Sequence, residues 1–250
     1  MKKFDRFLTR ACITLGLALL VAGCVATAPP PNYSDIIAAP DRTEADRKND
    51  ERRKPDELLA FTGARPGMKV LDMGAGGGYS TELIARSVAP GGTVYSQSPA
   101  DMFANAKKAY EERARRPAMK NAVRVERPFD DPLPPGVGDL DLITFFFFYH
   151  DTVWLGVDRQ KMNRRMFEVL KPGGLLVLAD HSARPGEGVS VAKNLHRIEE
   201  SVVRRELEAA GFQFVSEARF LRNPDDPRTA QVQKNPVSND EFVLKFRKPQ

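Results

Sequence analysis

The stretch from residue 70 to residue 79 restricts the possible folds more than any other part of the chain. It reads Val-Leu-Asp-Met-Gly-Ala-Gly-Gly-Gly-Tyr, so an apolar, strand-like segment runs directly into a glycine cluster. Glycine is required where the backbone takes a positive φ or where a ligand approaches too closely for a Cβ. A turn from a strand into a helix also points backbone amides at a ligand and favours an anionic group. The sequence therefore predicts a ligand site at a strand-to-helix turn.

The spacing of these glycines separates two ligand classes. In a dinucleotide fingerprint, G-x-G-x-x-G, a first glycine at Gly74 would place the third at residue 79, which is Tyr79. The glycines instead fall at positions 74, 76 and 78, and they follow an acidic residue, Asp72. No acidic residue ends the next strand-like segment either. The pattern therefore disfavours a nicotinamide dehydrogenase.

Strand-like and helix-like segments alternate on both sides of this turn. The strand candidates are residues 69–73, 93–96, 122–125, 140–149, 175–179, 212–218 and 241–246. Helical patterns occupy residues 80–88, 99–115 and 158–170, and a further helix ends near residue 210. Such alternation predicts an α/β fold with a doubly wound, mostly parallel, seven-stranded sheet. The last two strands follow each other without a helical pattern, which predicts an antiparallel C-terminal strand.

Several segments together resemble one enzyme family. The pattern D-x-G-x-G-x-G at residues 72–78 resembles the first motif of class I S-adenosylmethionine-dependent methyltransferases. Residues 139–143, 170–174 and 207–212 resemble, in the expected order, the start of strand four, the turn into strand five and the turn into strand six of that family. The resemblance covers about residues 55 to 248. It implies a Rossmann-like methyltransferase fold and S-adenosyl-L-methionine as the cofactor.

The resemblance also assigns cofactor contacts to particular positions. The residues of the glycine motif that it implies as cofactor-binding are Asp72, Gly74, Gly76, Gly78 and Tyr79.

Two further cofactor positions depart from the family pattern. Family members usually end strand two with an acid that binds the ribose, whereas this chain has Ser98 there, with Gln97 beside it. A hydrogen bond to a charged group contributes about 1.5–3 kcal/mol and a neutral one about 0.5–1.5 kcal/mol, so we expect a weaker cofactor affinity rather than none. Family members usually place a second acid, on the adenine side of the cofactor, after strand three. Asp130 is the candidate for this position, with Asp131 next to it. The alternative is that both are solvated loop residues.

Candidate catalytic residues follow the fourth and fifth strand candidates. Tyr149 closes the fourth, His150 and Asp151 follow it directly, and Asp180 and His181 come after the fifth. Because the carboxyl ends of neighbouring parallel strands share one edge, the two histidines could meet over a single pocket, where one could act as a general base near neutral pH. The alternative is that they are hydrogen-bonded loop residues. No metal site is expected, because His-x-x-x-His and clustered cysteine spacings are missing.

The N-terminus has the parts of an export signal. Basic residues between positions 2 and 10 precede an apolar run over residues 11–22, which is shorter than the roughly 20 residues of a spanning helix. The run ends in Val21-Ala22-Gly23-Cys24, which resembles the lipobox of bacterial lipoproteins. This resemblance implies a signal peptide over residues 1–23 and a lipid on Cys24. We expect a tether over residues 24–45 and the methyltransferase domain over residues 46–250 to follow it. A buried N-terminal helix or an uncleaved anchor is the alternative.

The charge distribution bears on the partners of the chain. The formal net charge is +5, but four basic residues against one acid within residues 1–23 account for +3 of it. The rest is nearly neutral, so nucleic-acid binding is not expected. We therefore expect a methyltransferase for a small-molecule acceptor, lipid-anchored in the cell envelope and facing the periplasm or exterior. The alternative is a catalytically lapsed fold that binds an envelope ligand; no oligomeric state is predicted.

Overall fold

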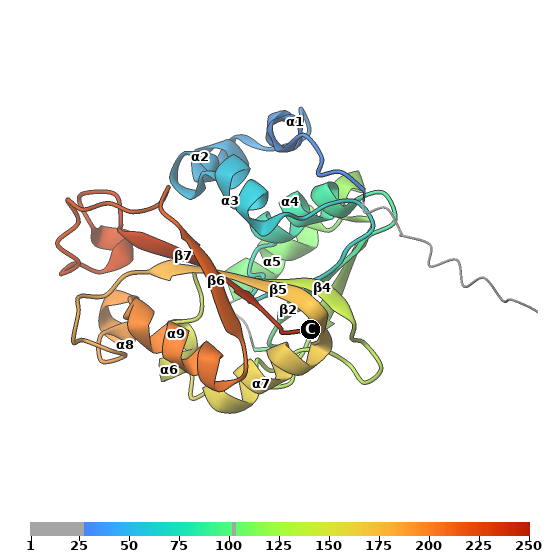
Figure 1. The fold of residues 1–250 in the computed structure, drawn as a ribbon. Helices are drawn as coiled ribbons and strands as arrows, with labels where there is room; N and C mark the ends of the chain where they lie inside the picture. Colours follow the sequence, from blue (N-terminus) through green and yellow to red (C-terminus); the bar gives the residue numbers. More distant parts are fainter. Residues whose placement is uncertain (1–27, 102–103) are drawn as a thin grey trace, which may run out of the picture.

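A seven-stranded sheet forms the centre of the molecule in the computed structural model, which describes residues 28–101 and 104–250 (Figure 1). The strand order is β3-β2-β1-β4-β5-β7-β6. The strands are β1 Lys69–Met73, β2 Thr93–Ser98, β3 Ala122–Glu126, β4 Leu140–Phe146, β5 Leu170–His181, β6 Gln213–Ala218 and β7 Glu241–Arg247. Strands β1 to β5 pair in parallel, whereas β7 is antiparallel to both β5 and β6. The predicted fold class is confirmed.

Helices cover both faces of this sheet, with α3 and α4 on one face and α7 and α9 on the other (Figure 1). Successive side chains of a strand point to opposite faces of the sheet, so a strand with consecutive apolar residues needs an apolar cover on both faces. Val70 joins the apolar core with α3 and α4, whereas Leu71 joins the core with α7 and α9. The helices are α1 Tyr33–Ala38, α2 Glu44–Arg53, α3 Pro55–Thr62, α4 Tyr79–Val88, α5 Ala104–Arg113, α6 Asp151–Trp154, α7 Arg159–Val169, α8 Ala192–Leu195 and α9 Glu200–Ala209, with short 3-10 turns at Pro117–Met119 and Val232–Lys234.

Strand β4 ends earlier than its apolar sequence predicts. The run of four phenylalanines extends to residue 148, but the strand stops at Phe146. Phe147 has φ +58° and donates its backbone N–H to the Ala179 carbonyl at 2.7 Å. A positive φ is costly for a bulky side chain and is found where the surrounding structure imposes it. The chain therefore turns at Phe147, and this turn places the residues from 148 to 154 at the carboxyl edge of the sheet.

The N-terminal part of the described chain is folded against the domain. The Tyr33 hydroxyl of α1 donates to the Ala64 carbonyl at 2.8 Å, and Ile36 and Ile37 pack against the core on the α3–α4 side. Within the expected tether over residues 24–45, the chain from Tyr33 to Ala38 is thus helical, and its apolar side chains are half-buried against the domain. The proposed signal peptide and Cys24 lie outside the described residues. None of the helices that the structure describes combines the length and the apolar composition that crossing a bilayer requires.

Buried ion pairs fasten α2 to α4 and α5. Asp46 of α2 and Glu82 of α4 each have side chains that are 1% exposed. Arg113 contacts both carboxylates at 2.5 Å, and Arg116 contacts them at 2.9 and 2.7 Å. Burial alone would raise the pKa of Asp46, but the hydrogen bonds from Arg113 and Arg116 hold it well below its usual range. The charge of Asp46 therefore stabilises the docked position of α2.

Replacing the buried carboxylate of Asp46 tests its contribution to the stability of the fold. Asp46→Asn leaves the two arginines with one acid fewer, and we expect a loss of about 3 kcal/mol in the free energy of unfolding at pH 7, measured by urea denaturation. Because the pKa of Asp46 is lower in the folded state, its stabilisation is present above about pH 4 and is lost as the pH falls further. The difference in the free energy of unfolding between wild type and variant should therefore shrink below about pH 4. Asp35→Asn, at an exposed position, is the control; an equal loss in both variants would contradict the assignment.

Candidate functional site

The glycine turn between β1 and α4 has the conformation that its sequence predicts. Gly74, Gly76 and Gly78 all have positive φ, at +62°, +55° and +78°. A Cβ on Gly74 would lie 3.3 Å from atoms of Phe145 and Phe148, so this glycine permits close packing. A Cβ on Gly76 would meet only the Gly74 carbonyl, at 3.9 Å. The backbone at Gly76 is therefore open to a ligand.

The carboxylate of Asp72 lies beneath this turn rather than beside the open face. It is 1% exposed, and it accepts hydrogen bonds from Ser80 at 2.9 Å, Thr81 at 2.6 Å and Thr144 at 2.8 Å. Burial raises its pKa above the usual value, against the effect of the hydroxyls. Asp72 thus holds α4 and β4 in position around the turn, and its expected contact with a cofactor stays a prediction.

The end of β2 contacts the turn through the residue beside Ser98. Gln97 is wholly buried; its Oε1 accepts the Gly74 N–H at 3.0 Å, and its Nε2 donates to the Arg127 carbonyl at 2.7 Å. This side chain ties the glycine turn to the loop after β3. Ser98 is the last residue of β2 and is buried, with 7% exposure.

Tyr79 is directed toward α2. Its hydroxyl donates to Asp50 at 2.5 Å, and Arg42 pairs with the same carboxylate at 2.7 Å. The Tyr79 hydroxyl is thus engaged by α2, and the expected cofactor contact of Tyr79 stays a prediction.

A first cavity opens beside the glycine turn, at the carboxyl ends of β2, β3 and β4. It has a volume of about 370 Å³, and its walls include Pro99, Pro128, Phe129, Asp130, Phe148 and Trp154. We call it the aromatic slot. Open α/β sheets bind ligands at this edge, and flat apolar walls with a few polar groups suit a planar ligand. The structure thus places Asp130 in this slot, where it also pairs with Lys161 at 3.0 Å.

A second cavity, of about 630 Å³, lies at the ends of β4 and β5. We call it the histidine cavity; its walls include Arg52, Arg53, Phe147, His150, Asp151, Trp154, His181 and His196. Trp154 lines both cavities. The Arg53 guanidinium stacks 4.1 Å from the centre of the Phe147 ring, and no acid of the described residues lies within ion-pair distance of it. Burial lowers the pKa of Arg53 to about 10, so it offers a positive charge to the cavity at neutral pH.

His150 is held between two carboxylates. Its Nδ1 lies 2.7 Å from Asp180 Oδ1, and its Nε2 lies 3.1 Å from Asp151 Oδ1. Burial works against charge on the ring, but Asp180 and Asp151 raise the pKa of His150 to about 10. Both ring nitrogens are therefore protonated at neutral pH in this arrangement. A protonated imidazole has no lone pair to accept a proton, so this arrangement disfavours His150 as a general base, whereas His181 lines the same cavity.

His181 lines the same cavity, whereas Tyr149 does not. The His181 ring centre lies 5.6 Å from that of His150, and burial lowers the pKa of His181, so its ring is neutral. Tyr149 is wholly buried between α7 and α9: its hydroxyl donates to Glu206 at 2.7 Å and accepts from Asn163 at 2.8 Å. The catalytic role expected for Tyr149 is corrected for this reason.

Sequence reasoning did not select several residues of the histidine cavity. His196 Nδ1 lies 3.1 Å from Asp151 Oδ1, which also accepts the Trp154 indole N–H at 2.8 Å. Forty-five positions separate His196 from Asp151. Local spacing therefore could not indicate this group, although Asp151 and Asp180 were marked by their positions after strands. Arg53 belongs to a charged segment that carries no signal of a site.

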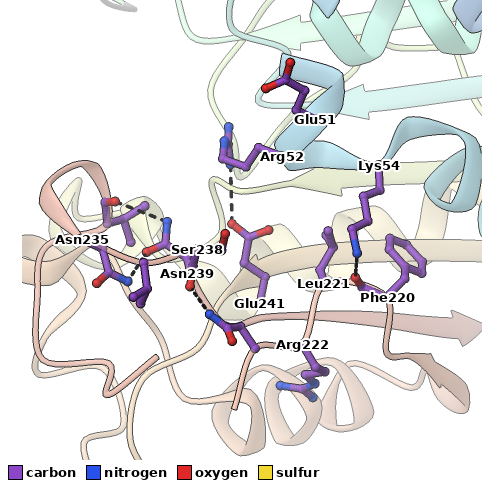
Figure 2. A pocket seen from close by; sticks show the side chains of 13 residues that line it. Glu51, Arg52, Lys54, Phe220, Leu221, Arg222, Asn235, Ser238, Asn239 and Glu241 are labelled. Atoms are coloured by element: carbon purple, nitrogen blue, oxygen red, sulfur yellow. Dashed lines mark hydrogen bonds and ion pairs between the residues drawn. The ribbon is translucent and has the colours of Figure 1, made fainter. Parts of the chain in front are cut away.

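A third cavity is lined by the end of α2 and by the C-terminal loops (Figure 2). It has a volume of about 580 Å³, and Arg52, Val232 and Asn239 line both cavities. Figure 2 shows Arg52 directed at Glu241, 3.5 Å away, and Lys54 donating to the Phe220 carbonyl at 2.6 Å. The two cavities therefore adjoin each other at the end of α2.

The assignment of Tyr149 to packing can be tested directly. Tyr149→Phe leaves Glu206 and Asn163 without their buried partner, so we expect a loss of about 1–3 kcal/mol in the free energy of unfolding. Binding of S-adenosylhomocysteine should stay within about twofold of wild type, measured by calorimetry. Tyr95→Phe, whose hydroxyl has no hydrogen-bond partner among the described residues, is the control. Unchanged stability with lost ligand binding in Tyr149→Phe would contradict the packing role.

Known proteins share this architecture. The ubiquinone/menaquinone biosynthesis C-methyltransferase UbiE of Cronobacter sakazakii is 28% identical over 180 residues, which cover 70% of this chain and 67% of that protein. UbiE of Vibrio vulnificus is 32% identical over 121 residues, so the chain matches 44% of the length of that protein. The crystal structure of a SAM-dependent methyltransferase from Aquifex aeolicus has the same fold, with a TM-score of 0.60 and 20% identity over 86% of this chain and 97% of that one.

The family model described as a methyltransferase domain matches residues 64–217, which include the glycine turn and β1 to β5. This match spans more than half of the chain, and the protein therefore belongs to the methyltransferase domain family.

Proposed function

We propose that the protein transfers a methyl group from S-adenosyl-L-methionine to a small-molecule acceptor. The observation that carries this proposal is the arrangement of two cavities about Trp154 at the carboxyl edge of the sheet. The aromatic slot adjoins the glycine turn through Phe148, and it shares Trp154 with the histidine cavity. A group-transfer enzyme needs two neighbouring sites of this kind, because both reactants must be held in contact.

The residues present fit the proposed cofactor. The open backbone at Gly76 would hold its amino-acid part, and the aromatic slot would hold the adenine, with Asp130 as a polar partner. When bound, the cofactor supplies an activated methyl group on a sulfonium.

The chain contributes binding and alignment to the reaction. Phe147 and Trp154 offer flat surfaces to the acceptor, and Arg52 and Arg53 offer positive charge. These features favour a planar acceptor that carries negative charge. Relatives that share 28–32% identity are named for ubiquinone and menaquinone biosynthesis, which supports an acceptor with an aromatic ring. Holding two reactants in a productive geometry contributes most of the catalysis expected for such a displacement.

The proposed cofactor site can be tested by filling the open face of the glycine turn. Gly76→Asn introduces a side chain that tolerates positive φ, so the backbone is retained while the ligand is blocked. We expect the affinity of the full chain for S-adenosylhomocysteine to fall more than about tenfold in calorimetric titration. Gly63→Asn is the matched control, because Gly63 has φ +70° at the end of α3 with nothing within 4 Å of the added Cβ. Equal affinity in both variants would contradict the site.

The second candidate function is ligand binding without catalysis. Two observations favour it. Ser98 is uncharged where the family usually has the acid that binds the ribose, and Gln97 already accepts the Gly74 backbone N–H. A folded, monodisperse wild-type protein that shows no binding of S-adenosylhomocysteine would support this candidate over the enzyme.

We further propose that the protein is lipid-anchored in the cell envelope through Cys24. The support is the order of basic residues, apolar run and Val21-Ala22-Gly23-Cys24 in the sequence. Mass spectrometry of the membrane fraction should find a chain that begins at a lipid-modified Cys24, and Cys24→Ser should abolish the modification. A chain that retains Met1 and carries no lipid would contradict the proposal.

A further inference from the structure

Three side chains converge on one point in the wall of the histidine cavity. Asp151 Oδ1 lies 3.1 Å from His150 Nε2 and 3.1 Å from His196 Nδ1. The three atoms all lie within 4.8 Å of one another. They come from separate parts of the chain: the turn after β4, the first residue of α6 and the residue that follows α8.

The separations are those of ligands around one metal ion. Bonds of 2.0–2.1 Å in a tetrahedral zinc site place neighbouring ligand atoms about 3.3 Å apart, and an octahedral site places them about 3.0 Å apart. Both observed separations fall between these values. Two imidazoles and one carboxylate are a donor set typical of Zn²⁺ and of other divalent transition metals. We propose that His150, Asp151 and His196 bind a divalent transition-metal ion, with Zn²⁺ the ion that this donor set fits best.

A second layer of hydrogen bonds orients the ligands, as in known metal sites. The wholly buried Asp180 accepts backbone N–H groups of His150 and His181 at 2.8 Å and binds His150 Nδ1 at 2.7 Å. This contact fixes the ring so that Nε2 faces Asp151. The Trp154 indole holds the Asp151 carboxylate at 2.8 Å.

The backbone of His196 also indicates a constrained position. It has φ +54°, in the left-handed region, and ends α8. A residue held in this region stores backbone strain, and such strain concentrates at binding sites.

The site leaves room for an exogenous ligand. Three protein donors leave the fourth position of a tetrahedral ion free, as in catalytic zinc sites, and all three donors line a cavity of about 630 Å³. The third cavity shares Arg52 and Asn239, both labelled in Figure 2, with the histidine cavity and so adjoins the site. A Zn²⁺ ion here would bind an acceptor hydroxyl or thiol and favour loss of its proton to water. That consequence rests on the proposed methyltransferase function, whereas the metal site itself does not.

Zinc titration of the metal-free full chain, against a chromogenic chelator, tests the site. We expect one Zn²⁺ per chain. His196→Asn, which suits a positive φ, should weaken the binding by more than about 100-fold, because it removes a ligand. Asp180→Asn should weaken it by about 10- to 100-fold, the effect typical of residues that orient a ligand.

The control is His181→Gln, which removes a histidine of the same cavity that lies outside the converging group and should retain one Zn²⁺ per chain. Substituting Co²⁺ gives a second readout, because tetrahedral Co²⁺ absorbs in the visible; the absorption should vanish in His196→Asn and persist in His181→Gln. Absence of binding in wild type, retained binding in His196→Asn, or loss in His181→Gln with its fold intact would overturn the proposal. Titration of each variant with S-adenosylhomocysteine separates this result from the proposed function, because either ligand can bind while the other fails.

Discussion

The buried carboxylate of Asp72 is the interaction on which the geometry of the site depends. Its burial is costly, and hydrogen bonds to a charged group, each contributing about 1.5–3 kcal/mol, offset that cost. The donors are hydroxyls of Ser80 and Thr81 on α4 and of Thr144 on β4, so one side chain joins β1, the first turn of α4 and the neighbouring strand. The glycine turn above it is thereby held at the carboxyl edge of the sheet, where the aromatic slot and the histidine cavity both open.

Charge is distributed unevenly along that edge. The aromatic slot has apolar walls with Asp130 at one side, whereas the histidine cavity combines buried carboxylates with two arginines from α2. Asp180 and Asp151 surround His150 so closely that they favour a positive charge at its ring, which a proton or a metal ion can supply. The turn at Phe147 makes this arrangement possible, because it brings the chain after β4 across the end of β5.

Local sequence patterns predicted the sheet and the place of the site, but not its full composition. Strand β1 was predicted with its observed bounds, because five residues of strand-like sequence meet a glycine turn there. The edge of the sheet that holds the site could be predicted from the topology, because parallel strands have their carboxyl ends at the same edge. Tyr149 was misassigned because the positive φ at Phe147 changes the direction of the following side chains, and a sequence of phenylalanines does not reveal this. Arg53 and His196 reach the cavity only through long-range packing of α2 and α8.

A crystal structure of the full chain with S-adenosylhomocysteine would test most directly that the two cavities beside Trp154 hold the two reactants. We expect density for the adenine in the aromatic slot against Phe148, with the sulfur beside Trp154 and the histidine cavity free for the acceptor. Density that fills the histidine cavity and leaves the aromatic slot without ligand would contradict the assignment of the two sites.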